Sequence, residues 1–282
     1  MTDIDLKSYF ARIGYSGPPS ATLETLQALH RLHPAAITFE NLDPLMKRPV
    51  RLQTGALMSK LVDQKRGGYC YEHNSLFAAV LRSLGFSVVT LAARVQWGVA
   101  KDALRPRSHM LLRVELPHGA YLADVGFGLL TLTAPLQLRP DLEQPTPHGL
   151  HKLVRVGDEL QLQVKQTDGW IPIYQLSLQE QAPSDWEVQN WFTSTHPDSI
   201  FTNSLVVARP VADLRYALLN DRLSVHHPDG AIQRRVVHGS SELAPLLIDI
   251  FDIRLPPSLD DLFWRIMERH AQSSPLQNAN SS

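Results

Sequence analysis

The sequence has few of the features that place a protein in a class at first sight. Its 282 residues include one cysteine, Cys70, so no disulfide can form within the chain, and a lone thiol suits a reducing compartment. Lysine and arginine total 27 against 28 acidic residues, which leaves no basic excess for nucleic acid or anionic lipid. No apolar run approaches the roughly 18 residues that cross a bilayer, and the first ten residues are too polar for a signal peptide. We expect a cytoplasmic protein without nucleic-acid or membrane partners.

The composition is that of a folded protein with helices first and strands later. Hydrophobic residues make up 44% and charged residues 20% of the chain, and its length favours two or three subdomains. Apolar residues recur at helical spacing in residues 3–15, 22–33, 54–65 and from about 70 to 84. We expect Pro34 to close the second helix and Gly85 to end the fourth.

Beyond Gly85 the pattern changes to short alternating runs that predict strands. These runs cover residues 87–97, 109–116, 120–127, 152–157, 160–166 and 170–178. The last third predicts a hairpin over 216–239 with Pro-Asp-Gly at its turn, helices over 240–251 and 258–270, and a disordered tail over 272–282. The fold class is therefore α+β.

Cys70 stands where the fourth helix is expected to begin. A lone cysteine of this kind is more often a small buried hydrophobe than a catalyst. Its neighbours favour the second role, because Gly67 and Gly68 permit a tight turn and close backbone approach. A helix that begins here aims free N–H groups and its positive dipole end at the sulfur, which stabilises a thiolate and offers donors to a developing oxyanion.

A nucleophilic thiol needs a base and a group that orients the base. His109 opens the strand over 109–116, and Asp124 ends the next one. A four-residue turn over 116–119 would place Leu111 opposite Asp124, so that His109 and Asp124 share a face as diagonal neighbours. An aspartate in such an apolar strand is costly to bury without a partner. The sequence thus predicts a Cys70–His109–Asp124 group, with an inert buried thiol as the alternative.

Three segments resemble the catalytic signatures of the arylamine N-acetyltransferases in the family's order. They are RGGYCYEHNSLF at 66–77, SHMLLRV at 108–114 and YLADVGFG at 121–128. The segments ITFENLDPL at 37–45, TLTAPLQL at 131–138 and NWFTSTHPDSIF at 190–201 are similar to further family segments. Together these segments are far more specific than any one of them.

The resemblance implies a three-part architecture with a catalytic core like that of papain-like proteases and transglutaminases. Its parts would be an N-terminal helical bundle over 1–87, a β-barrel domain over 88–195 and an α/β lid over 196–282. Cys70 would be the acyl-accepting nucleophile, His109 its base and Asp124 the residue that orients the imidazole. Acetyl-CoA would be the co-substrate. Its acetyl group would pass through a Cys70 thioester to an arylamine, hydrazine or arylhydroxylamine by a ping-pong mechanism.

The resemblance also implies substrate contacts around these three residues. Phe127 and Phe201 would line the acceptor pocket, and Ser108, Gly126 and Gly128 would meet coenzyme A. Glu40 and Arg66 flank the cysteine in the sequence and are expected to form an ion pair that braces its loop.

Other readings of the same residues remain open. The histidines lack zinc-ligand spacing with cysteine or carboxylate, so we expect no metal. A cysteine amidase or transglutaminase-like enzyme would use the same three residues, and a binding module would leave Cys70 inert. Propionyl-CoA or another acyl-CoA could replace acetyl-CoA as donor.

Overall fold

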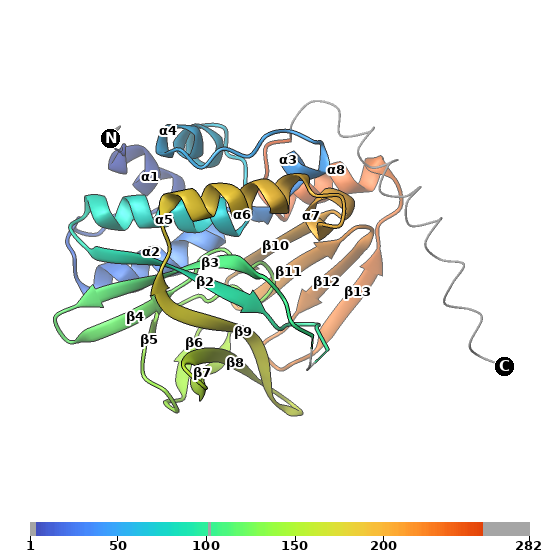
Figure 1. The fold of residues 1–282 in the computed structure, drawn as a ribbon. Coiled ribbons are helices and arrows are strands. Elements are labelled where there is room, and N and C mark those ends of the chain that lie inside the picture. Colours follow the sequence, from blue (N-terminus) through green and yellow to red (C-terminus); the bar gives the residue numbers. More distant parts are fainter. Residues whose placement is uncertain (1–3, 101–102, 256–282) are drawn as a thin grey trace.

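A computed structural model describes residues 4–100 and 103–255 (Figure 1). The helix predicted over 258–270 and the tail over 272–282 lie outside the described residues. The N-terminal part is helical, as expected. Its elements are α1 (Leu6–Ile13), α2 (Leu23–Ala36), β1 (Phe39–Glu40), α3 (Leu42–Leu45), α4 (Thr54–Leu57), the π-helix η1 (Met58–Asp63) and α5 (Cys70–Ser83). No helix in the described ranges is long and apolar enough to cross a bilayer.

The second helix runs further than the sequence predicts. Pro34 does not close α2, which continues to Ala36. Proline removes one backbone donor, and here that loss falls within the last turn. The helical hydrogen bonds continue after Pro34, because the N–H of Ile37 donates to the carbonyl of His33 over 2.8 Å. The expected end at residue 34 is therefore wrong by two residues.

The segment predicted as a helix over 54–65 is α-helical only in its first turn. From Met58 to Asp63 it becomes a π-helix, in which the N–H of Gln64 donates to the carbonyl of Ser59 over 2.9 Å. A π-turn holds one extra residue compared with an α-turn. Lys60 therefore turns toward acidic partners while Leu61 and Val62 stay in the core.

An eight-stranded antiparallel sheet forms the middle of the molecule, in the order β5-β4-β3-β2-β9-β8-β7-β6. Its strands are β2 (Ser87–Val95), β3 (Arg107–Leu116), β4 (Gly119–Ala123), β5 (Leu136–Gln137), β6 (Gln144–Thr146), β7 (Gly149–Val156), β8 (Glu159–Gln166) and β9 (Gly169–Glu180). The two edge strands meet through side chains. The Gln137 N–H donates to Gln144 Oε1 over 2.7 Å, and Gln144 Nε2 donates to the Gln137 carbonyl over 3.0 Å. The sheet thus closes almost completely into a barrel.

Strand β3 belongs to the barrel wall and has the barrel interior on one face and the helices on the other, so both of its faces are buried. Leu111 points into the barrel core with Leu91 and Leu122, whereas its neighbour Leu112 packs in the core formed with the helices. Side chains alternate along a strand, so β3 serves two cores at once. Helix α5 lies against β2 and β3, which brings its N-terminus to the start of β3.

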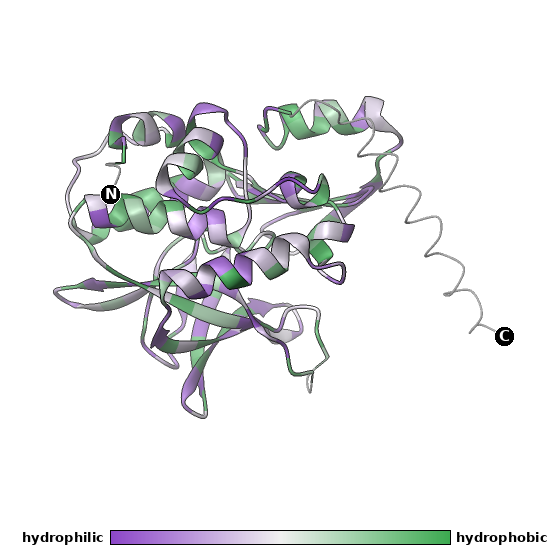
Figure 2. Ribbon diagram, turned by 45° about the horizontal axis from the view of Figure 1, so that its top comes forward, coloured by the Kyte–Doolittle hydropathy of each residue, from purple (hydrophilic) through white to green (hydrophobic). Residues whose placement is uncertain are grey.

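A second sheet completes the fold, in the order β1-β10-β11-β12-β13. Its other strands are β10 (Val206–Val211), β11 (Leu214–Leu219), β12 (Arg222–His226) and β13 (Ile232–Val236), and helix α8 (Ser240–Asp249) follows. The predicted Pro-Asp-Gly turn is confirmed between β12 and β13. Residues 216–239 nevertheless hold parts of three strands and not the two of one hairpin, because Asn220 and Asp221 form a second turn between β11 and β12. Helix α8 is mostly hydrophobic along its middle (Figure 2) and packs in the core of this sheet. Because Phe39 pairs with Ala208, the sheet joins the first and last parts of the described chain.

Helices α6 (Pro183–Thr195) and α7 (Ile200–Asn203) are not predicted from the sequence. Helix α6 has no continuous apolar stripe, since Val188 and Trp191 are about two-thirds exposed, and hydrophilic and hydrophobic residues mix along it in Figure 2. Its start does carry a signal, because Asp185 accepts from the N–H of Ala182 over 2.9 Å, in the manner of a helix cap. The expected boundaries of the three parts, at 87 and 195, stay predictions.

Candidate active site

Cys70 is the first residue of α5, as the sequence predicts. The thiol is 4% exposed and donates to the carbonyl of Ser108 on β3 over 3.9 Å. The first N–H groups of a helix have no acceptor within it, so donors and the positive dipole end surround the sulfur. The preceding loop is tightly packed: a Cβ on Gly67 would lie 2.1 Å from the carbonyl oxygen of Thr38. Only glycine fits at that position.

The expected ion pair beside this loop is confirmed. Arg66 Nη2 lies 3.0 Å from Glu40 Oε1 and 3.1 Å from Asp43 Oδ1. Glu40 is fully buried and Arg66 is 7% exposed. The pair therefore anchors the residues just ahead of Cys70 to β1 and α3.

His109 and Asp124 meet through the register that the hairpin turn sets. Leu112 pairs with Ala123 and Leu116 with Gly119, so Leu111 lies opposite Asp124 as predicted. His109 Nε2 is 2.7 Å from Asp124 Oδ2. This contact occupies Nε2 and leaves Nδ1 of the imidazole for Cys70.

The carboxylate of Asp124 is fixed by donors from three directions. Besides the His109 contact, its Oδ1 accepts from Asn74 Nδ2 and from the N–H of Gly126, each over 3.0 Å. Burial favours the neutral acid, but His109 and these hydrogen bonds hold the pKa of Asp124 below its ordinary value. The N–H of Asp124 itself donates to Nε2 of the buried His30 over 3.0 Å. Asp124 is therefore held ionised and immobile.

Asn74 and His30 are site residues that the sequence interpretation does not find. Asn74 stands four residues after Cys70, and residues at that spacing share one face of a helix, so its position was available as a signal. It also donates to the Met110 carbonyl over 2.7 Å and accepts from the Val125 N–H over 3.1 Å. His30 comes from α2, and nothing in the sequence connects it to Asp124.

The electrostatics of His109 favour its charged form. Burial alone would lower the pKa of the imidazole, but the Asp124 carboxylate, followed by the contact with Cys70, raises it to about 10. The ring is also held by aromatic neighbours. Phe127 meets it edge-on with ring centroids 4.9 Å apart, and Tyr174 lies 5.1 Å away. The structure thus places next to the thiol an oriented imidazole whose charged form is favoured once it takes up a proton.

A cavity of about 750 Å³ opens over this group. It brings together all of the predicted contact residues, since Phe127, Phe201, Ser108, Gly126 and Gly128 line it with Cys70 and His109. Its other walls come from the loop after β2, from α6 and α7, and from β10 and β11. Two arginines, Arg105 and Arg222, line it and no described carboxylate does. The cavity is apolar with a cationic component.

At the floor of the site, the backbone of Gly126 packs directly against the start of α5. A Cβ there would lie 2.9 Å from the His73 Cβ and 3.1 Å from both Asn74 Nδ2 and the Cys70 Cα. The loop after Asp124 therefore rests directly on the first turn of α5. Because Gly126 has no side chain, Cys70 can lie close to His109 and Asp124.

A chain of buried rings supports α5 from the opposite side. The Thr38 carbonyl can only accept, so His73 Nε2 must donate to it over 3.2 Å. His73 Nδ1 then accepts from His33 Nε2 over 2.9 Å, and His33 Nδ1 accepts from the Tyr9 hydroxyl over 2.7 Å. Every ring is neutral in this pattern. Burial lowers the pKa of His73 to about 4 and that of His33 well below its ordinary value.

These rings predict acid instability. Burial also lowers the pKa of His30 to about 4, so His30 and His73 each contribute roughly 3 kcal/mol that is present above pH 6.5 and is lost as the pH falls toward 4. Glu72 partly offsets this, because its pKa is raised by burial to about 6. The stabilisation from His109 is lost only as the pH rises from 6.5 toward 10. The free energy of unfolding should fall by at least roughly 2 kcal/mol between pH 7 and pH 5, because the lowered pKa values of His33 and His151 act in the same direction.

Urea unfolding at the two pH values measures this loss. His73→Gln should weaken the pH dependence, since glutamine can donate to the Thr38 carbonyl and accept from His33 without titrating. His118→Gln, in the exposed turn after β3, is the matched control and should leave the dependence unchanged. Equal stability of the wild type at pH 5 and pH 7 would contradict the neutral-ring assignment.

No group of three or more His, Cys, Asp or Glu side chains within the described ranges is arranged to hold a metal ion. The expectation of a metal-free site stays a prediction.

Comparison with known proteins agrees with the geometry. Residues 22–259 match the family model described as N-acetyltransferase. The chain is 42% identical over 256 residues to an arylamine N-acetyltransferase from Mycolicibacterium smegmatis, covering 89% of this chain and 93% of the relative. It is 40% identical over 254 residues to an arylamine N-acetyltransferase from Escherichia coli K12, covering 90% of each.

Solved structures agree over nearly the whole chain. The Mycobacterium marinum arylamine N-acetyltransferase in complex with CoA superposes with a TM-score of 0.87 at 40% identity, covering 94% of this chain and 98% of that one. The M. smegmatis arylamine N-acetyltransferase gives a TM-score of 0.89 at 40% identity with the same coverage. Sequence, fold and site lead to one conclusion: the chain belongs to the arylamine N-acetyltransferase family.

Proposed function

We propose that this protein transfers an acetyl group from acetyl-CoA to arylamines, hydrazines or arylhydroxylamines through a thioester on Cys70. The observation that carries the proposal is the contact of a helix-borne thiol with the His109–Asp124 pair at the floor of a large apolar cavity. The CoA complex of a relative with 40% identity supports the choice of donor.

The first half-reaction uses Cys70 as nucleophile and His109 as proton carrier. The sulfur, its proton passed to His109 Nδ1, attacks the acetyl carbon of acetyl-CoA. Helix N–H groups at the start of α5 are placed to stabilise the oxyanion. When the carbon–sulfur bond to coenzyme A breaks, His109 returns its proton to the departing thiolate. The products are free coenzyme A and acetylated Cys70.

In the second half-reaction Cys70, which accepted the acetyl group in the first, donates it to the amine. An amine attacks the thioester carbon, His109 accepts the proton that the amine loses, and the Cys70 sulfur departs. Arylamines are weak bases and stay neutral nucleophiles at pH 7, whereas an aliphatic ammonium must first lose a proton. Phe127 and Phe201 in the cavity wall offer faces and edges for an aromatic acceptor.

The two cavity arginines fit an anionic donor. Arg105 and Arg222 are exposed, no described carboxylate lines the cavity, and guanidinium groups bind phosphate by charge-assisted hydrogen bonds. We propose that they attract the phosphates of coenzyme A. Their charge is expected to favour the binding of acetyl-CoA without changing the rate of the chemical step.

Arg222→Gln should therefore raise KM for acetyl-CoA by about 3- to 10-fold and leave kcat nearly unchanged. Steady-state kinetics with acetyl-CoA and with p-nitrophenyl acetate, a donor without phosphates, would separate the charge effect from damage to the cavity. Arg234→Gln, an exposed arginine of β13 outside the cavity, is the control. Equal losses with both donors would contradict the phosphate role.

Initial velocities with both substrates varied test the order of events. A covalent intermediate predicts parallel double-reciprocal lines, with coenzyme A released before the amine binds. Intersecting lines would mean direct transfer in a ternary complex. Ammonia release from amides, together with indifference to acetyl-CoA, would instead identify a cysteine amidase or transglutaminase-like enzyme.

A further inference from the structure

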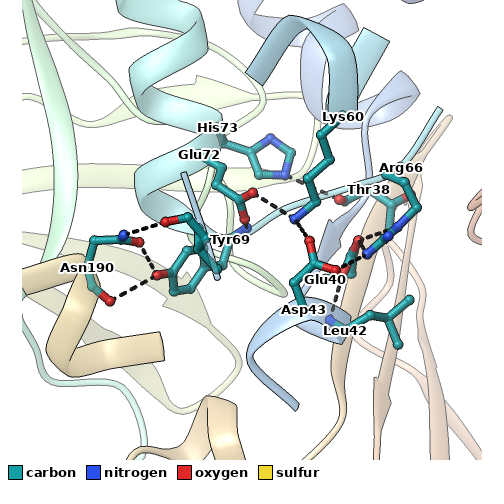
Figure 3. Close-up of polar contacts among 11 residues, drawn as sticks. Thr38, Glu40, Leu42, Asp43, Lys60, Arg66, Tyr69, Glu72, His73 and Asn190 are labelled. Carbon is teal, nitrogen blue, oxygen red and sulfur yellow. Dashed lines mark hydrogen bonds and ion pairs between the residues drawn. The ribbon is translucent and has the colours of Figure 1, made fainter. Parts of the chain in front are cut away.

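Five charged side chains with little solvent exposure lie together beside the loop that leads into Cys70, residues 66–69 (Figure 3). They form the buried ion cluster, which consists of Glu40, Asp43, Lys60, Arg66 and Glu72. Three carboxylates face two bases, so the cluster carries a formal charge of −1. Arg66 serves Glu40 and Asp43, as described above. Lys60 and Glu72 have no place in the proposed chemistry, yet burying charges is costly unless each is matched.

Lys60 is the link between two parts of the cluster. Its Nζ lies 2.7 Å from Asp43 Oδ2 and 2.7 Å from Glu72 Oε1, and its side chain is only 14% exposed. The residue reaches this position from the π-helix η1, a rare conformation found often at functional sites. Lysine is almost never buried without partners. Here both of its carboxylate contacts are made inside the protein.

Glu72 connects the cluster to the nucleophile. It stands two residues after Cys70 in the first turn of α5. While Oε1 binds Lys60, Oε2 accepts from the N–H of Tyr69 over 3.1 Å. Tyr69 caps α5 and immediately precedes Cys70. A Cβ on Gly68 would lie 2.7 Å from Glu72 Oε2, so the loop is held against this carboxylate.

Tyr69 is fixed at its other end as well. Its hydroxyl donates to Asn190 of α6 (Figure 3). One of the paths that hold the backbone ahead of Cys70 thus runs from Lys60 through the Glu72 carboxylate to the Tyr69 N–H. We propose that Lys60 is a positioning residue for the nucleophile: by holding the ionised Glu72 carboxylate, it fixes the turn from which Cys70 faces His109. This inference rests on the proposed role of Cys70 as acyl acceptor.

The charges around Glu72 show why Lys60 is needed. The pKa of Glu72 is raised to about 6: burial is the largest cause, Lys60 opposes the rise, and the nearby carboxylates of Glu40 and Asp43 add to it. His73, the next residue, is neutral and adds no charge. Without Lys60, Glu72 would bind a proton near neutral pH, and its hydrogen bond to Tyr69 would lose the assistance of charge.

The test is the rate constant for acetylation of Cys70 by p-nitrophenyl acetate, measured by stopped flow from pH 5 to pH 9. Lys60→Met should lower it at least tenfold at pH 7 and move the acid limb of the profile about one unit upward. Lys7→Met, the same change at an exposed lysine of α1, is the matched control and should leave the profile unchanged. A folded Lys60→Met protein with the wild-type profile would overturn the inference.

The double variant Lys60→Met with Glu72→Gln separates positioning from general damage, and it serves if Lys60→Met alone fails to fold. A glutamine oxygen can accept from the Tyr69 N–H and needs no counter-charge. The double variant should therefore react within about threefold of the wild-type rate, with a flatter acid limb. A double variant as slow as Lys60→Met would overturn the inference. A wild-type protein that acetyl donors do not modify would instead refute the proposed function, so the two failures are distinguishable.

Discussion

Replacing Asp124 with asparagine is expected to lower kcat/KM for acetyl transfer by about 10³- to 10⁴-fold while the protein remains folded. The reason lies in how the side chain is held. Asn74 Nδ2 and the Gly126 N–H both donate to Oδ1, so an asparagine would keep its oxygen there and turn its NH₂ group toward His109. Nε2 of His109 would then have to accept. The proton would move to Nδ1, where it blocks uptake of the Cys70 proton.

The loss of charge acts in the same direction. Asp124 is the main group that raises the pKa of His109 to about 10, so a neutral side chain would leave burial to favour the uncharged ring. Kinetics with acetyl-CoA and an arylamine measure the loss, and ¹⁵N NMR of the His109 ring reports which nitrogen carries the proton. Activity within tenfold of the wild type, with the proton still on Nε2, would show that the carboxylate charge is not required.

Removal of the Arg66 guanidinium should cause the largest loss of stability. Arg66→Met is expected to cost about 3 to 5 kcal/mol of unfolding free energy. The change deprives two carboxylates of a partner, because Nε and Nη2 donate to Glu40 over 3.2 and 3.0 Å, and Nη2 also donates to Asp43. Glu40 is fully buried, so water cannot replace the lost donors. Equilibrium unfolding in urea measures the cost.

A more exposed ion pair, Arg113 with Glu115, is the matched control. Arg113 Nε lies 2.7 Å from Glu115 Oε1, but the two side chains are 28% and 42% exposed. Arg113→Met should cost at most about 1 kcal/mol. Equal costs for the two variants would mean that burial does not govern the strength of the ion pairs here.

The part of the site that sequence predicts best is the part that local geometry fixes. A four-residue turn determines the register of a hairpin, and that register places His109 beside Asp124. The start of α5 at Cys70 is likewise encoded locally, in the glycines before it and the apolar stripe after it. The fold class follows from the same periodicities, since helical spacing gives way to alternation after Gly85.

The remainder depends on contacts between distant segments. His30 reaches Asp124 across 94 positions of the chain, and no local pattern records such a meeting. The same holds for Lys60, whose partners lie in α3 and α5. Its π-turn also differs from an α-turn by one residue, a difference that apolar spacing does not resolve. Helix α6 escapes sequence prediction because its outer face keeps large apolar residues, which conceals the amphipathic pattern on which such prediction relies.

The most direct test of the account is the mass of the intact protein after brief exposure to acetyl-CoA, with Cys70→Ala beside it. A covalent mechanism predicts an adduct of about 42 Da on the wild type alone. The adduct should disappear when 4-aminobenzoate is added, as N-acetylated 4-aminobenzoate forms in equal amount. A folded wild-type protein that acetyl-CoA leaves unmodified, or an equal adduct on Cys70→Ala, would contradict the central claim that Cys70 carries the acetyl group.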